Sequence, residues 1–290
     1  MNEWVPAFLA EKIPLGRWVK DFVGFITDNF YDQLRLFSDG LGFVIDGLVA
    51  LLQAVPPLVL IALICGLGYW MHRSWKLVAG IALGLLLILN LGYWDRTIET
   101  IALVLSATVI SILFGVPLGI AAARRRWLYA VLRPILDLMQ TIPTFVYLIP
   151  TLIFFGLGMV PGLISTVIFA IPAPIRLTYL GISGVPRQLV EAGEAFGSTR
   201  MQLLLKVELP HAMPTIMAGI TQCIMLSLSM VVIAALVGAK GLGEPVVRAL
   251  NTINIAKGFE AGLSIVIVAI LLDRILKQRE DPGAPGADRR

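Results

Sequence analysis

The sequence predicts an all-helical, polytopic membrane protein with about seven transmembrane helices, preceded by an amphipathic N-terminal segment. Hydrophobic residues make up 58% of its 290 residues and charged residues only 14%, with a mean hydropathy of +0.86. A soluble protein needs about 25% charged residues to cover its surface, and the composition equally excludes a disordered or collagen-like chain. Several uncharged runs are long enough for membrane helices, so we expect lipid to cover most of the protein.

Residues 1–46 precede the first long apolar run and are expected to lie outside the membrane. Between residues 18 and 32, aromatic and aliphatic side chains recur at helical spacing among charged ones, which predicts an amphipathic helix. Its apolar face would lie in the headgroup layer or pack on other helices, and the pattern is compatible with both. The start of the chain lacks the basic and unbroken apolar segments of a cleavable signal peptide, so we expect this segment to be retained.

Uncharged runs define the predicted transmembrane helices, because a helix of about 20 residues crosses the hydrocarbon core of a bilayer. Six runs reach or approach this length: residues 47–71, 77–94, 100–123, 138–175, 212–239 and 261–272. The fourth run is too long for one crossing, and the turn-forming residues Gly156, Gly158 and Pro161 divide it into two. The sixth run is short and needs flanking residues such as Phe259. The count is therefore about seven.

These runs group into three parts of the chain. Residues 47–96 hold two N-terminal transmembrane helices, and residues 97–276 hold a core of the remaining crossings. The only sizeable internal loop, residues 181–211, lies between the fifth and sixth crossings. Residues 277–290 are polar and rich in proline and glycine, which predicts a disordered tail.

Lysine and arginine residues predict the orientation, because they accumulate in cytoplasmic loops. Most of the 23 lie on the side that carries loop 181–211 and the C-terminus, so this side is predicted to be cytoplasmic and the N-terminus periplasmic. The cluster Arg124, Arg125 and Arg126 directly follows a predicted span. We interpret it as a topology anchor in the lipid bilayer and expect no nucleic-acid partner.

The sequence carries no signature of an enzyme. Charged residues near the predicted spans lie at their ends, where capping or snorkelling explains them, and this leaves no proton relay. No second histidine, cysteine or carboxylate stands at metal-ligand spacing in the sequence from His72 or His211, and Cys65 and Cys223 occur in apolar stretches. A GxxxxGK[ST] phosphate loop is absent, so transport would need a partner, a gradient or a passive pore. The uncharged spans disfavour a gradient.

Loop 181–211 predicts two short helices. Residues 188–196 combine helix formers with an apolar side, and Gly197 is placed to end this helix because glycine readily adopts a left-handed conformation. A second helix is expected over residues 199–206 and is closed by Leu209 and Pro210. Such a pair on the cytoplasmic face would present a firm surface to a soluble partner.

The same loop contains a motif of defined spacing. Its residues are Glu191, Ala192, Gly193, Gly197, Val207, Leu209 and Pro210. This arrangement resembles the loop of binding-protein-dependent ABC importer permeases, whose pattern is E-A-A, three residues, G, nine residues, I, any residue, L-P. Gly193 stands for the second alanine and Val207 for the isoleucine, and both replacements are small or apolar.

The resemblance extends over residues 13–276. Residues 136–158, 172–182, 209–251 and 258–275 resemble the glycine betaine, proline and choline uptake permeases. Within that group, KIPLGRWVK near the start and LNLGYW before the third span look closest to choline permeases.

The resemblance implies a type I ABC importer permease fold in a bacterial inner membrane. It implies a homodimer joined to two cytoplasmic ATP-binding subunits and served by a periplasmic substrate-binding protein. The chain itself would hold no cofactor and no metal, would not be an enzyme, and would leave ATP and Mg²⁺ to the partner ATPase.

The loop helix would then insert into a groove on each ATPase and transmit the closure of the ATPase dimer to the spans. Coupling roles follow for Glu191, Ala192, Gly193, Gly197 and Pro210, with Arg187 as a weaker polar contact. A purely shape-giving role for Gly197 and Pro210 is compatible with coupling.

The implied substrate is choline or a related quaternary amine, such as glycine betaine or proline betaine. Proline and glycine in the fourth and fifth spans predict kinks that line a translocation pathway or a close interface. Aromatic faces attract such cations, and the candidates are Phe145, Tyr147, Phe154 and Phe155, for which packing roles also stay open. The alternatives are a secondary transporter and an osmotic channel, neither of which needs the loop motif.

Overall fold

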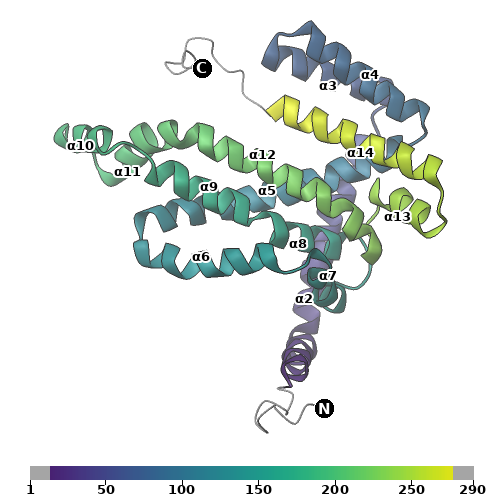
Figure 1. Cartoon of the computed structure of the whole chain (residues 1–290), viewed down its shortest axis with the longest axis horizontal. Helices are drawn as coiled ribbons and strands as arrows, with labels where there is room; N and C mark the ends of the chain where they lie inside the picture. Colours follow the sequence, from purple (N-terminus) through teal and green to yellow (C-terminus); the bar gives the residue numbers. More distant parts are fainter. Residues whose placement is uncertain (1–13, 277–290) are drawn as a thin grey trace, which may run out of the picture.

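The computed structural model describes residues 14–276 of the chain, and these fold into helices (Figure 1). The tail predicted over residues 277–290 lies outside the described residues, as does the start of the N-terminal segment. The elements in order are α2 (Leu15–Gln53), α3 (Pro57–His72), α4 (Trp75–Asn90), α5 (Trp94–Arg124), α6 (Arg126–Thr141), α7 (Thr144–Phe155), α8 (Met159–Ala170), α9 (Pro172–Ser183), α10 (Arg187–Ala195), α11 (Arg200–Leu203), the π-helical turn η1 (Leu204–Glu208), α12 (Leu209–Ala234), the 3-10 turn η2 (Ala235–Val237), α13 (Gly243–Asn251) and α14 (Ile255–Leu276).

Helix α2 contains the predicted amphipathic segment and continues beyond it. It runs for 39 residues through the expected boundary at residue 46, with a local irregularity at Phe30. In Figure 1 it crosses the direction of the other long helices, and its N-terminal half extends beyond them. Its C-terminal half packs on α5 and α8, where Ile45 is buried with Ala107, Val160 and Leu163. The predicted amphipathic segment, residues 18–32, is not the part that packs: Trp18, Phe22 and Phe25 are exposed, so both alternatives for its apolar face stay open.

Helices α3 and α4 replace the first two predicted spans. The run 47–71 does not form one helix, because residues up to Gln53 belong to α2 and the pair Pro56 and Pro57 starts a new helix. Proline lacks the amide hydrogen that a continuing helix needs but suits its first turn. Each of α3 and α4 has 16 residues, which corresponds to about 24 Å at 1.5 Å per residue and falls short of the 30 Å hydrocarbon core.

The number of candidate spans is accordingly smaller than the predicted seven. Within residues 14–276, five helical segments are long and apolar enough to cross a membrane, or six when the bent pair α6 and α7 is counted as one. The five are Gly16–Gln53, Trp94–Arg124, Met159–Ser183, Arg200–Val237 and Ile255–Ile275. The difference arises because α3 and α4, which correspond to two predicted spans, are too short to be counted, whereas the long helix α2 adds one candidate span.

The predicted break within residues 138–175 is confirmed. Helix α7 ends at Gly156, whose φ of +73° is left-handed, and Gly158 with φ of +138° precedes α8. Pro161 lies in the first turn of α8, a position that proline tolerates. Helices α6 and α7 meet at an angle of 97°.

The centre of the fold is a close-packed group formed by α5, α8, α9 and α12. Small residues allow this approach: a Cβ on Gly119 of α5 would lie 2.7 Å from the Ile175 carbonyl oxygen of α9. Likewise, a Cβ on Gly219 of α12 would lie 2.9 Å from Cβ of Leu177. Glycine at helix contacts is typical of membrane proteins, because helices in lipid associate through close van der Waals packing of their backbones and gain no hydrophobic effect. The loop after α9 is thus attached to a rigid group.

Candidate functional site

Helices α10 and α11 project from one end of the bundle, between α9 and α12 (Figure 1). Helix α10 begins at Arg187 after Pro186 and ends at Ala195, which confirms the first predicted helix of loop 181–211 to within one residue. Pro186 suits this start, because the residue before the first helical turn makes no intrahelical hydrogen bond through its N–H.

Gly197 ends α10 as predicted. Its φ is +74°, a left-handed conformation, and its N–H donates to the Glu194 carbonyl at 2.9 Å. The Ser198 N–H donates to the Gly193 carbonyl at 3.1 Å. These two bonds form a Schellman motif, in which glycine avoids the strain that a side chain would meet.

The predicted end of the second helix at Pro210 is wrong, whereas its predicted start at Thr199 agrees with the structure. The Thr199 hydroxyl accepts the Gln202 N–H at 3.3 Å and the Gln202 side chain accepts the Thr199 N–H at 2.8 Å, a capping box that the spacing Thr-x-x-Gln could have predicted. The helix does not close at Pro210 but continues through η1 and α12 to Val237. Pro210 cannot donate an amide hydrogen, and the π-helical turn directly before it lets the helix continue.

Gly193 brings α10 onto α11. A Cβ at this position would lie 2.6 Å from Cδ1 of Leu203 and 3.6 Å from Cγ2 of Val207. Leu203 is buried there. Helices α10 and α11 therefore form one folded unit.

This unit presents an exposed apolar surface, which we call the α10–α11 surface. It consists of Leu189, Phe196, Met201 and Leu205, and Phe196 is 91% exposed. The predicted coupling residues Arg187, Glu191 and Ala192 are exposed on α10 beside it. Exposed apolar groups with polar neighbours are typical of protein-interaction sites. Met201 and Leu205 lay outside the recognised motif.

Arg124 attaches this unit to the bundle, a contact that the sequence analysis missed. One guanidinium nitrogen lies 2.7 Å from Oε2 of Glu208 and donates to the Arg200 carbonyl oxygen at 3.1 Å. Arg124 ends α5 and Glu208 ends η1, so the ion pair joins helices that are distant in sequence. A second pair, Arg176 with Asp137 at 2.6 Å, joins α9 to α6 in the same way.

The four aromatic pathway candidates all lie on α7, in differing surroundings. Phe145 is 57% exposed, while the Tyr147 hydroxyl donates to the Met139 carbonyl oxygen of α6 at 2.6 Å. Phe155 packs against Phe37 of α2 with ring centroids 6.2 Å apart and touches Phe154 edge-on. Tyr147 and Phe155 thus already hold α7 to its neighbours.

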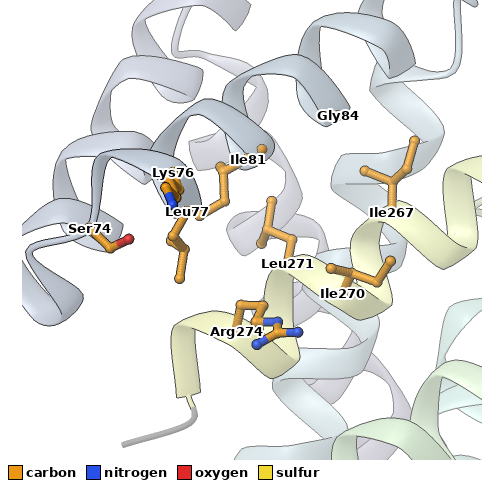
Figure 2. A pocket seen from close by; sticks show the side chains of 10 residues that line it. Ser74, Lys76, Leu77, Ile81, Gly84, Ile267, Ile270, Leu271 and Arg274 are labelled. Atoms are coloured by element: carbon orange, nitrogen blue, oxygen red, sulfur yellow. The ribbon is translucent and has the colours of Figure 1, made fainter. Parts of the chain in front are cut away.

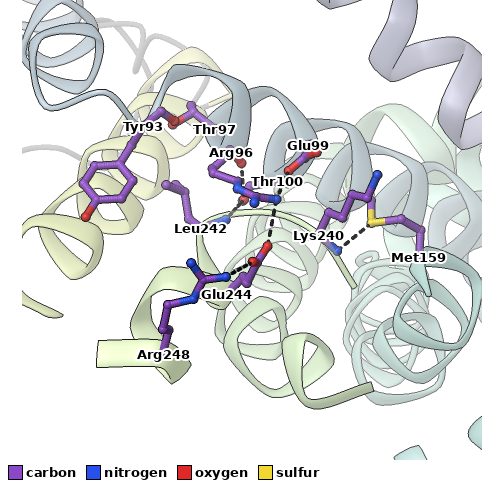
Figure 3. Close-up of polar contacts among 10 residues, drawn as sticks. All are labelled: Tyr93, Arg96, Thr97, Glu99, Thr100, Met159, Lys240, Leu242, Glu244 and Arg248. Carbon is purple, nitrogen blue, oxygen red and sulfur yellow. Dashed lines mark hydrogen bonds and ion pairs between the residues drawn. The ribbon is translucent and has the colours of Figure 1, made fainter. Parts of the chain in front are cut away.

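A polar network lies at the other end of the bundle (Figure 3). Glu244 of α13 accepts from Arg96 at 2.7 Å and from Arg248 at 2.8 Å, and Arg96 also reaches Glu99 at 3.2 Å. The buried Thr100 hydroxyl accepts the Leu242 N–H at 2.8 Å. The segment between α12 and α13 is thereby bound to the start of α5.

Tyr93 lies beside this network, in the connection between α4 and α5 (Figure 3). Burial raises the pKa of Tyr93 above its ordinary value, and the charge of Glu260 and a hydrogen bond with that carboxylate raise it further. The phenol therefore stays protonated well into the alkaline range.

Comparison with known proteins gives consistent results. The family described as "Binding-protein-dependent transport system inner membrane component" matches residues 115–278. The glycine betaine transport system permease protein OpuAB of Bacillus subtilis is 49% identical over 268 residues, which cover 91% of this chain and 93% of that protein. The glycine betaine/carnitine transport permease protein GbuB of Listeria monocytogenes is 46% identical, covering 91% and 94%.

Choline permeases are more distant than expected. The choline transport system permease protein OpuBB of Bacillus subtilis is 30% identical over 195 residues, covering 67% of this chain and 90% of that protein. The expectation that the sequence is closest to choline permeases is therefore not supported.

The fold also has a solved counterpart. An inward-facing structure of the MetNI methionine ABC transporter matches with a TM-score of 0.55 and 23% identity, covering 61% of this chain and 91% of that chain. The family match spans more than half of the residues. The chain therefore belongs to the inner membrane components of binding-protein-dependent transport systems, as the permease of an ABC importer that works with a substrate-binding protein and leaves ATP hydrolysis to a separate subunit.

Proposed function

We propose that the protein imports glycine betaine and related quaternary amines, such as proline betaine and carnitine, with choline as a weaker substrate. The observation that carries this proposal is the 49% identity to a glycine betaine permease over 91% of the chain. The 30% identity to a choline permease supports the order of preference. Osmoprotection is the role that such solutes serve.

The α10–α11 surface is the docking site for the ATPase in this proposal. Glu191 and Ala192 contact the ATPase groove with Arg187 at its edge, while Gly193 and Gly197 shape the helix pair. Phe196 supports this assignment, because an exposed aromatic ring is typical of residues that dominate binding at interfaces. Pro210 contributes through the helix geometry that it imposes after η1.

The proposed assembly is a homodimer with two ATPase subunits, which bind ATP and Mg²⁺, and one periplasmic binding protein. Loop 181–211 and the C-terminus face the cytoplasm, and residues 1–46 face the periplasm. Arg125 and Arg126 are exposed, and they follow the end of α5 that lies near the α10–α11 surface. Their positive charge supports this orientation.

The translocation pathway is proposed to run beside α7. Phe145 is the aromatic candidate with the most exposed ring, which favours it for a cation–π contact with a quaternary amine. The bend between α6 and α7 supports a nearby pathway, because unpaired backbone groups at such breaks need protein or water partners.

The test is ATP-dependent uptake of labelled glycine betaine by proteoliposomes that contain the permease, its ATPase and its binding protein. Uptake should need all three components, and unlabelled glycine betaine should compete better than choline. A Gly197→Asp variant should lose uptake while it still inserts into the membrane, because its backbone needs a left-handed glycine beside the docking site.

Two outcomes would contradict the proposal. Uptake without an ATPase, driven by an ion gradient, would indicate a secondary transporter, and conductance without ATP would indicate an osmotic channel. Stronger competition by choline would overturn the substrate order alone.

A further inference from the structure

A groove lies between α4 and α14, away from the docking surface (Figure 2). Its cavity volume is about 470 Å³, and its walls are the apolar side chains of Leu77, Ile81, Ile267, Ile270 and Leu271. The two helices run antiparallel here, with Lys76 and Arg274 towards one end and Gly84 and Ile267 towards the other.

Two glycines one helical turn apart create the groove. A Cβ on Gly84 would lie 2.7 Å from Cγ2 of Ile267, so α4 touches α14 at this point. A Cβ on Gly80 would meet nothing within 4 Å. The helices therefore meet at Gly84 and leave a hollow beside Gly80, floored by the buried side chains of Ile81 and Leu271.

The open end of the groove carries positive charge. Lys76 and Arg274 both line it and both are exposed. Neither forms an ion pair with any carboxylate in residues 14–276, although Asp273 neighbours Arg274 in the chain. A negatively charged ligand group is thus the complement of this end.

Aromatic residues place the charged end at the level of the lipid headgroups. Trp70 at the end of α3 is 78% exposed and Trp75 at the start of α4 is 72% exposed. Exposed tryptophans with nearby lysine and arginine mark the interface between membrane and water. The apolar walls then extend from this level towards the bilayer core.

We propose that the groove binds an anionic phospholipid. Its phosphate lies between Lys76 and Arg274, and one acyl chain fills the hollow beside Gly80. Basic pockets between transmembrane helices bind anionic headgroups in this way. The lipid adds a contact between α4 and α14 to the direct one at Gly84.

The test is native mass spectrometry of the full-length permease titrated with dioleoyl phosphatidylglycerol or dioleoyl phosphatidylcholine. We expect one tightly retained phosphatidylglycerol per chain and no such retention of phosphatidylcholine. Replacing Lys76 and Arg274 by glutamine should weaken binding about fivefold for each, the factor that corresponds to about 1 kcal/mol per basic residue at an anionic surface. Arg126→Gln, an exposed basic control without an ion pair among residues 14–276, should bind normally.

A second variant separates the acyl chain from the headgroup. Gly80→Leu fills the hollow and raises helix propensity, so it should fold and yet lose the lipid. Full retention by Gly80→Leu, equal retention of phosphatidylcholine, or displacement by inorganic phosphate at equal concentration would overturn the proposal. Disulfide-linked dimers of a Gly80→Cys variant in membranes would also overturn it, by assigning the groove to a second copy of the chain.

Discussion

The guanidinium of Arg124 lies 2.7 Å from the carboxylate of Glu208 and also bonds the Arg200 carbonyl oxygen. Arg124 ends α5, a helix of the packed centre, and Glu208 ends the turn that follows α11. A force applied to the α10–α11 surface therefore reaches α5 directly, in addition to α9 and α12 through the chain. Under the proposed docking of the ATPase at this surface, this contact is a route by which that docking would move the spans.

The first prediction concerns this ion pair. Glu208→Arg should place like charges together and reduce uptake per ATP hydrolysed severalfold. Exchanging both residues, Arg124→Glu with Glu208→Arg, should recover part of the coupling. Uptake and ATP hydrolysis are measured on the same proteoliposomes. Unchanged coupling in Glu208→Arg would exclude a mechanical role for the pair.

The second prediction concerns Phe196. Phe196→Asp should weaken ATPase binding by at least about 30-fold, because an exposed aromatic anchor typically contributes 2 kcal/mol or more. The control is Ile253→Asp, which changes an equally exposed apolar residue near the opposite end of the bundle, where φ of +51° suits aspartate. Binding is measured by surface plasmon resonance with the permease in nanodiscs. Equal weakening by both variants would show a non-specific effect.

The third prediction contrasts two glycines of the same helix pair. Gly197→Ala should destabilise α10 by about 1 kcal/mol, because φ of +74° strains any residue with a Cβ. Gly193→Ala should change stability by less than about 0.5 kcal/mol, because gained helix propensity offsets a contact with the flexible end of Leu203. Hydrogen exchange over residues 187–203 measures both. The reverse order would contradict the assigned backbone geometry.

Local signals account for what the sequence predicted well. Gly197 ends α10 because the glycine itself supplies the required backbone conformation, and the glycines at residues 156 and 158 separate α7 from α8 for the same reason. The pair Pro56 and Pro57 was an equally local signal, yet counting uncharged residues alone hid the break that it causes. A count of uncharged residues gives the length of an apolar run but does not show where proline interrupts its helix.

Contacts between distant segments account for what the sequence could not predict. Arg124 and Glu208 are 84 residues apart, and the arginine stands in a cluster that topology alone explains. The continuation of the helix past Pro210 depends on the π turn and on packing of α12 against α9. Neither effect leaves a pattern in neighbouring residues.

The fourth prediction concerns the buried bond between Thr100 and Leu242. Thr100→Val keeps the side-chain shape but leaves the Leu242 N–H without its acceptor, which should cost about 1–3 kcal/mol. Hydrogen exchange at the Leu242 amide should accelerate in this variant. Thr100→Ser retains the oxygen, so the same amide should stay protected. Equal exchange in both variants would mean that the hydroxyl does not hold this segment.

The fifth prediction concerns the pH dependence of Tyr93. Burial and the Glu260 carboxylate raise its pKa above the ordinary value of about 10, so the folded protein favours the neutral phenol. This contribution to stability is complete below pH 10 and is lost as the pH rises through the folded-state pKa. The tyrosinate absorbance that appears late in an alkaline titration should decrease by the contribution of one tyrosine in Tyr93→Phe. In Glu260→Gln that group should titrate earlier but still above the ordinary value, because burial is the larger cause. An unchanged titration in Glu260→Gln would show that the carboxylate does not act on the phenol.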